Sequence, residues 1–150
     1  MPIVYILISL CALVGIDQVI KIWISANISE TTSTTIIPGV LSITNLHNSG
    51  AAWSILEGQQ WLFSIITLVT VVAIVYFMIK LKGRKLYLTS ITILLAGILG
   101  NFINRFLQGY VVDMFQVDFI NFPVFNFADI CITFGIILLF FAILRDGDLD

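Results

Sequence analysis

Four long apolar segments constrain the fold of this chain more than any other feature. They cover about residues 3–24, 61–79, 86–103 and 127–144. A helix needs about 20 mostly apolar residues to cross a bilayer, and each segment reaches or approaches that length. Because 59% of the 150 residues are hydrophobic and 11% are charged, too few polar side chains exist to cover a soluble domain. We predict an all-α membrane protein with four transmembrane helices, forming one integral membrane domain over residues 1–150.

The basic residues indicate how the four spans are oriented. Four of the seven Lys and Arg residues lie in the turn 80–85, between the second and third spans. Turns rich in Lys and Arg stay on the cytoplasmic side, so we expect both termini inside and the connections 25–60 and 104–126 outside. The net charge is −2, and no basic surface is left for a nucleic acid, which excludes that class of partner.

The first outer connection carries two β-prone stretches. Residues 34–37 and 40–46 are rich in Thr, Ile and Val, and Pro38-Gly39 between them is typical of a turn. We therefore predict a small extracytoplasmic β-rich element between the first two spans. The two cysteines, Cys11 and Cys131, have no metal-ligand spacing.

Five ionisable residues are expected in one layer, at the outer ends of the spans or just beyond them. They are Asp17, Lys21, Arg105, Asp113 and Asp129. A charge at such depth costs about 2.5–3.5 kcal/mol, so such residues usually face a cavity and mark a functional site. Asp17 and Lys21 are spaced i, i+4 on the first helix and can form an ion pair. A structural ion pair and direct contact with a substrate both remain open for them.

Asp113 and Asp129 point to a specific chemistry. Neither has a local basic partner, and Arg105 can balance only one of them. Two carboxylates in a partly desolvated site cannot both ionise cheaply, so they share one proton. This is the arrangement of an aspartic protease, in which the ionised carboxylate activates water and the protonated one donates to the scissile carbonyl. Intramembrane carboxylates also serve ion transport, so a transporter or channel subunit is one alternative, and a structural helper of a membrane complex is another.

Residues 45–53 form a stretch that is polar, then small, then aromatic. Such a stretch suits a chain that returns to the membrane interface close to a ligand, although Ser49-Gly50 alone indicates a turn. His47 with Ser49 or Ser54 would suggest a serine hydrolase, but no third orienting group stands nearby in the sequence. We expect His47 to be a solvated loop residue.

Five short motifs together resemble the bacterial lipoprotein signal peptidases, also called signal peptidase II. Their order, and the four spans between which they lie, make the resemblance specific, and it covers nearly the whole chain. The motifs are Asp17-Gln18-Val19-Ile20-Lys21, Asn48-Ser49-Gly50-Ala51-Ala52-Trp53, Gly100-Asn101-Phe102-Ile103-Asn104-Arg105, Val111-Val112-Asp113 and Phe125-Asn126-Phe127-Ala128-Asp129.

The resemblance implies an aspartic endopeptidase of the bacterial cytoplasmic membrane, with its active site near the outer face. Such an enzyme cuts diacylglyceryl-modified prolipoproteins just before the lipid-bearing cysteine and uses no metal or cofactor. Membrane lipids and cyclic peptide inhibitors of the globomycin type are its other implied partners. By motif, Asp113 and Asp129 match the catalytic dyad. The matching substrate-binding positions are Asn48, Gly50, Asn101, Arg105, Asn126 and Ala128, and the supporting positions are Asp17, Lys21 and Asn104.

One position departs from the family pattern. The third motif usually reads Gly-Asn-x-x-Asp-Arg, and this chain has Asn104 where the Asp is expected. We expect the amide to support a neighbouring group such as Arg105 through hydrogen bonds. These are weaker than the charge-assisted bonds of a carboxylate, which are about twice as strong, but the reaction should be the same.

Overall fold

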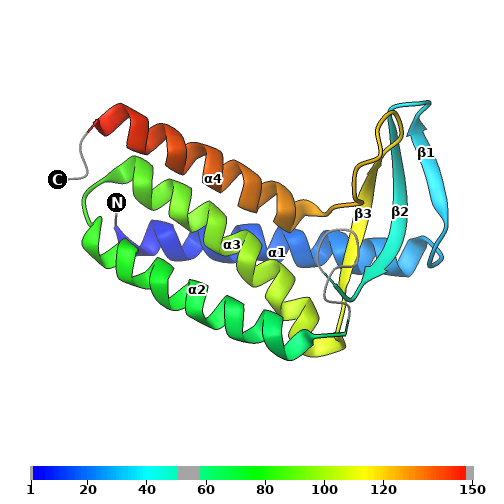
Figure 1. Ribbon diagram of the computed structural model, residues 1–150, viewed down its shortest axis with the longest axis horizontal. Coiled ribbons are helices and arrows are strands. Elements are labelled where there is room, and N and C mark those ends of the chain that lie inside the picture. Colours follow the sequence, from blue (N-terminus) through cyan, green and yellow to red (C-terminus); the bar gives the residue numbers. More distant parts are fainter. Residues whose placement is uncertain (1, 51–57, 148–150) are drawn as a thin grey trace.

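The computed structural model describes residues 2–50 and 58–147. Four helices lie alongside one another, and a small sheet lies at one end of them, opposite the start of the first helix and the end of the last (Figure 1). In chain order the elements are α1 (Ile3–Asn27), β1 (Ser33–Ile37), β2 (Leu41–Asn48), α2 (Gln60–Lys80), α3 (Lys85–Gln108), β3 (Val111–Val117) and α4 (Phe127–Asp146).

All four helices are long and apolar enough to cross a membrane, with mean hydropathy between 1.9 and 2.7 in their most apolar stretches. The predicted four-helix membrane fold is thus confirmed. α3 is the central helix, because 56% of its apolar stretch is buried, against 6–22% for the other three. It packs against α1, α2 and α4, so residues at its outer end can reach all the other helices.

Small residues let α3 and α4 approach closely. A Cβ atom added at Gly135 of α4 would lie 2.7 Å from the backbone nitrogen of Leu94 in α3, and Gly97 faces the main chain around Ala128 and Ile132 in the same way. Close approach through small residues is how helices commonly pack in membranes, where no hydrophobic force drives them together. The contact fixes the first turn of α4 against α3.

The sheet is antiparallel, with the order β1-β2-β3. β1 and β2 form the predicted hairpin, and its turn contains Gly39 with a φ of 72°. β3 was not predicted, since its residues lie in the second outer connection. It pairs with β2 so that Asn48 lies opposite Val111 and Leu46 lies opposite Asp113. This pairing is the reason that Asn48 and Asp113 come together.

α3 extends to Gln108, past the predicted span end near residue 103. It ends at Gly109, whose φ of 80° lies in the left-handed region that closes many helices. Asn104 and Arg105 are therefore helical residues, and they point in different directions from the α3 axis.

Candidate active site

A cavity of about 180 Å³ lies where the outer ends of α3 and α4 meet β2 and β3. It contains both carboxylates of the predicted dyad and four of the predicted substrate-binding residues. The lining residues are Asn48, Asn101, Arg105, Asp113, Phe122, Pro123, Val124, Phe125, Asn126 and Asp129.

Asp113 projects into this cavity from β3 and is 2% exposed. Its Oδ2 accepts a hydrogen bond from Asn48 Nδ2 at 2.8 Å, and its Oδ1 accepts one from Asn126 Nδ2 at 2.6 Å. Burial raises the pKa of Asp113 from 3.8 to about 6, although the two amide hydrogen bonds act in the opposite direction. The nearby charge of Asp129 raises it further. Asp113 can therefore hold a proton at a pH where an ordinary carboxyl has lost it.

Asp129 is held by the start of α4. Asn126 caps this helix, because its side chain accepts a hydrogen bond from Asp129 N at 3.0 Å and its own N–H donates to Asp129 Oδ2 at 3.1 Å. This reciprocal arrangement is a capping box. The other carboxylate oxygen, Oδ1, accepts from Asn101 Nδ2 of α3 at 2.7 Å. Every oxygen of the two carboxylates thus accepts at least one N–H.

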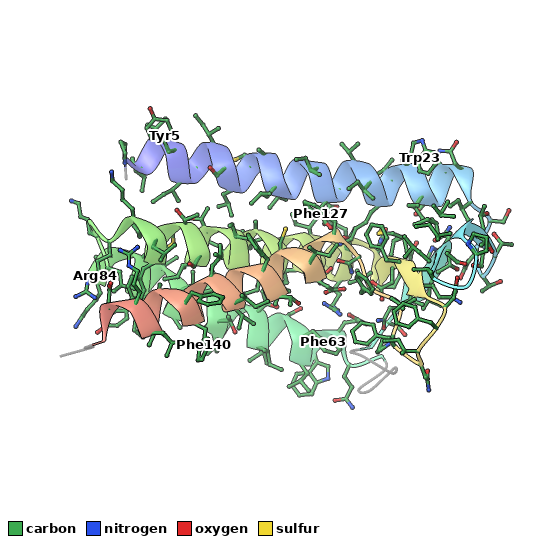
Figure 2. The ribbon with its side chains drawn as sticks, turned by 90° about the horizontal axis from the view of Figure 1, so that it is seen from above. Tyr5, Trp23, Phe63, Arg84, Phe127 and Phe140 are labelled. Atoms are coloured by element: carbon green, nitrogen blue, oxygen red, sulfur yellow. The ribbon has the colours of Figure 1, made fainter. Side chains whose placement is uncertain are left out.

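Arg105 joins α3 to the segment that follows β2. Its guanidinium donates to Gly50 O at 3.0 Å and lies 4.7 Å from the centre of the Phe63 ring in α2. Figure 2 shows Phe63 at the end of α2 that faces the sheet. Gly50 also donates its N–H to Asn48 Oδ1 at 2.9 Å. Gly50 therefore acts through its main chain on two residues that line the cavity.

Beside these two carboxylates lies a buried ion pair between Asp17 and Lys21 of α1. Their charged atoms are 2.9 Å apart, and both side chains are 2% exposed. Asp17 Oδ1 also accepts the N–H of Ala128 at 3.0 Å, and Lys21 donates to Asn101 Oδ1 at 3.0 Å. Of the two roles left open for Asp17 and Lys21, the structure shows the ion pair.

The chain is similar to known proteins over nearly its whole length. Residues 9–145 match the family described as signal peptidase (SPase) II. The chain belongs to this family. A lipoprotein signal peptidase of Lactiplantibacillus plantarum is 53% identical over 144 residues, which are 96% of this chain and 97% of that protein. One of Lactococcus lactis subsp. lactis is 50% identical over 132 residues, 88% of each chain.

Two solved structures of bacterial membrane enzymes, obtained by the in meso method at 2.3 and 1.9 Å resolution, resemble the fold. The first has a TM-score of 0.90 at 39% identity and covers 96% of this chain and 90% of that one. The second has a TM-score of 0.87 at 40% identity and covers 95% of this chain and 94% of that one. Membership of the signal peptidase II family confirms the predicted aspartic endopeptidase and excludes the transporter and structural-helper alternatives. Within residues 2–50 and 58–147, no group of three or more His, Cys, Asp and Glu side chains is placed to hold a metal ion.

Asn104 hydrogen-bonds a neighbouring group, as expected, but this group is Gln18 and not Arg105. Its amide exchanges two hydrogen bonds of 3.2 Å with Gln18 of α1, and the Arg105 guanidinium donates to Gly50 instead. Consecutive residues on a helix do not face each other, so Asn104 and Arg105 point to different neighbours. Gln18 also donates to Asp17 Oδ2 at 2.9 Å and to Gly100 O at 3.1 Å. Gln18 lies in the first motif, but no role was predicted for it.

The expectation that His47 is a solvated loop residue is wrong. His47 lies on β2, stacks on Tyr110 with 4.0 Å between ring centres, and approaches Glu30 at 3.2 Å. Part of the second motif, residues 51–53, lies outside the described part of the chain, as does Ser54. The aromatic lining residues Phe122 and Phe125 were given no role by the sequence, although Phe125 lies in the fifth motif, because a Phe gives little functional signal in so apolar a chain.

Proposed function

We propose that this signal peptidase II family member cuts diacylglyceryl-modified prolipoproteins just before the lipid-bearing cysteine, with Asp113 and Asp129 as its catalytic dyad. One observation carries the proposal. Two carboxylates line one small cavity, and burial raises the pKa of one of them, Asp113, to about 6. Such a pair holds one proton between its two carboxyl groups over a useful pH range, which is the requirement for aspartic protease chemistry.

Burial assigns a role to each carboxylate. Asp113 is the acid, because burial raises its pKa to about 6. Asp129, which accepts the N–H groups of Asn101 and Asn126, is then the base. It takes a proton from water as the water oxygen attacks the scissile carbonyl carbon, while Asp113 gives its proton to the carbonyl oxygen. Asp129 then protonates the leaving amide nitrogen, and Asp113 recovers its proton as the C–N bond breaks. The dyad ends with one proton, as it began.

The surroundings of the dyad suit an apolar, extended substrate. A second groove, of about 380 Å³, shares Phe122, Phe125 and Asp129 with the cavity and continues along α4 past Thr133 and Ile137. Its lining is almost entirely apolar, apart from Asp129 and Thr133, so it can bury the hydrophobic part of a membrane-bound substrate next to the scissile bond. Asn48, Asn101, Arg105 and Asn126 provide the polar groups that orient the peptide. Gly50 supports Asn48 and Arg105 through its main chain, and the N–H of Ala128 holds Asp17.

We propose that the protein is a single domain of the bacterial cytoplasmic membrane, with both termini inside and the dyad near the outer face. The basic turn supports this orientation, because Arg84 and Tyr5 lie at one end of the bundle and Trp23 at the other (Figure 2). Membrane lipids would surround the exposed aliphatic and aromatic side chains of the helices. A cyclic peptide of the globomycin type would compete with substrate for the cavity.

Cleavage by the purified protein in detergent tests the proposed substrate. Two synthetic precursor peptides of one sequence are needed, one with a diacylglyceryl group on its cysteine and one with a free thiol. We expect only the lipidated peptide to be cut, with mass spectrometry placing the new N-terminus at the cysteine. No cleavage, equal cleavage of both peptides, or cleavage at another bond would contradict the proposal.

A further inference from the structure

Three asparagine side chains donate to the two carboxylates, and the orientation of each amide decides whether it can do so. A carboxamide has two N–H donors on one side and an acceptor oxygen on the other. If it turns by 180°, it presents oxygen to the carboxylate in place of N–H. The three amides belong to Asn48, Asn101 and Asn126.

The main chain fixes two of these amides. Gly50 N donates to Asn48 Oδ1 at 2.9 Å, which leaves Asn48 Nδ2 for Asp113. Asp129 N donates to Asn126 Oδ1 at 3.0 Å, which leaves Asn126 Nδ2 for Asp113 as well. A side-chain substitution elsewhere cannot remove these two backbone donors.

Asn101 is oriented by a side chain. Its Oδ1 accepts from Lys21 Nζ at 3.0 Å, and its Nδ2 donates to Asp129 Oδ1 at 2.7 Å. An ammonium group has donors and no acceptor. If the Asn101 amide turned over, its N–H groups would face the Lys21 ammonium and its oxygen would face the Asp129 carboxylate. Both contacts would be repulsive in a site where Asn101 is 7% exposed and Lys21 is 2% exposed.

We propose that Lys21 is a positioning residue for the dyad, whose ammonium holds the Asn101 amide with its N–H toward Asp129. This inference rests on the proposed function of Asp113 and Asp129. Asp17 keeps the ammonium in place through the 2.9 Å ion pair, and the N–H of Ala128 in turn holds Asp17. A series of contacts thus runs from α1 through Asn101 of α3 to Asp129 of α4.

The test must separate the N–H donor of Lys21 from its positive charge. The charged groups that interact with Asp129 are Lys21 from α1, Arg105 from α3 and Asp113 from β3, and Asp17 of α1 is paired with Lys21. Removing Lys21 alone would leave Asp17 without its counter-ion, so the comparison uses an Asp17→Asn background. In this background Lys21→Gln and Lys21→Met both remove the charge, whereas only Gln keeps an N–H that can donate to Asn101.

The measurements are the pH profile of kcat for cleavage of the lipidated peptide and the melting temperature of each purified variant. With Met, we expect kcat to fall by about tenfold or more, because a hydrogen bond to a charged group is lost. We also expect the acidic limb of the pH profile to move up, because an amide oxygen that faces a carboxylate disfavours the charged form of the dyad. With Gln, the limb should move up less than with Met, because the positive charge is lost but the N–H toward Asn101 is kept. The two double variants should melt at similar temperatures.

Each alternative outcome overturns the proposal. An equal upward shift for Gln and Met would show that Lys21 acts through its charge and not through the amide. If the acidic limb does not move in either double variant and kcat stays close to that of the Asp17→Asn protein, Lys21 has a structural role only. If the double variants do not fold, the same two changes at Lys21 in the otherwise unaltered chain give the comparison. Failure of the unaltered protein to cleave the peptide would instead contradict the proposed function.

Discussion

At the scale of single residues, the site pairs each negative charge with a positive one if the dyad holds one proton. Lys21 balances Asp17 in a buried ion pair. Arg105 can then balance the single negative charge that Asp113 and Asp129 share. A second ionised carboxylate would be uncompensated in a largely buried layer, which is expensive. The charge balance therefore supports the one-proton dyad independently of the raised pKa of Asp113.

Activity should depend on pH as a bell, because the reaction needs one ionised and one protonated carboxyl group. The alkaline limb should lie at about pH 6 or above, since burial raises the pKa of Asp113 to about 6 and a bound substrate excludes further water. The measurement is the initial rate of lipidated-peptide cleavage over the pH range in which the protein stays folded. A rate that rises steadily with pH, without an alkaline limb, would show that no protonated carboxyl is required.

The stability of the protein should also reveal the raised pKa of Asp113. Between the unfolded value of 3.8 and the folded value of about 6, the folded state binds more protons, so stability is lost as pH rises through this range. The loss is on the order of 3 kcal/mol. Asp113→Asn removes this titration. The melting temperature of the variant minus that of the unaltered protein should therefore increase as the pH rises from 4 to 8. A difference in melting temperature that does not change with pH would contradict the raised pKa.

At the scale of elements, the dyad depends on where helices and strands come close. β3 carries Asp113 and α4 carries Asp129, while α3 lies against both. Glycine residues allow two close contacts between helices. Gly135 of α4 lies against Leu94 of α3, and Gly100 of α3 leaves room for the Asp17 carboxylate of α1. A Cβ atom at Gly100 would lie 2.6 Å from Asp17 Oδ2, so one methyl group there must displace the buried ion pair.

Three alanine substitutions test these approaches. Gly135→Ala should lower stability by about 1–3 kcal/mol, the usual cost of overpacking, with kcat of the folded fraction preserved. Gly100→Ala should lower both stability and kcat, because the displaced Asp17 holds Lys21 and Ala128. Gly15→Ala is the matched control, since nothing lies within 4 Å of its added Cβ. The measurements are the melting temperature and the cleavage rate of each of the three variants. Wild-type stability and activity of Gly100→Ala would contradict the described packing.

At the scale of the whole molecule, the elements that can be predicted from the sequence are those that depend on local composition. The four helices and the β1–β2 hairpin follow from apolar length and turn residues. β3 could not be predicted, because Val111–Val117 becomes a strand by pairing with a distant segment. The Gln18–Asn104 contact likewise joins residues 86 positions apart. Asp113 and Asp129 could be proposed as a dyad from the sequence, because charged residues in so apolar a chain are few and conspicuous.

The catalytic role of the two carboxylates is tested most directly by the cleavage rate of Asp113→Asn and Asp129→Asn with the lipidated peptide. Asparagine keeps the shape of the side chain but cannot carry the proton, so each variant should lose at least about 10³-fold in rate. Asp118→Asn is the control, because Asp118 accepts from Ser42 at 2.7 Å on the sheet and is not among the cavity's lining residues. We expect folded, inactive dyad variants beside an active Asp118→Asn protein. Substantial turnover by either dyad variant would contradict that catalytic role.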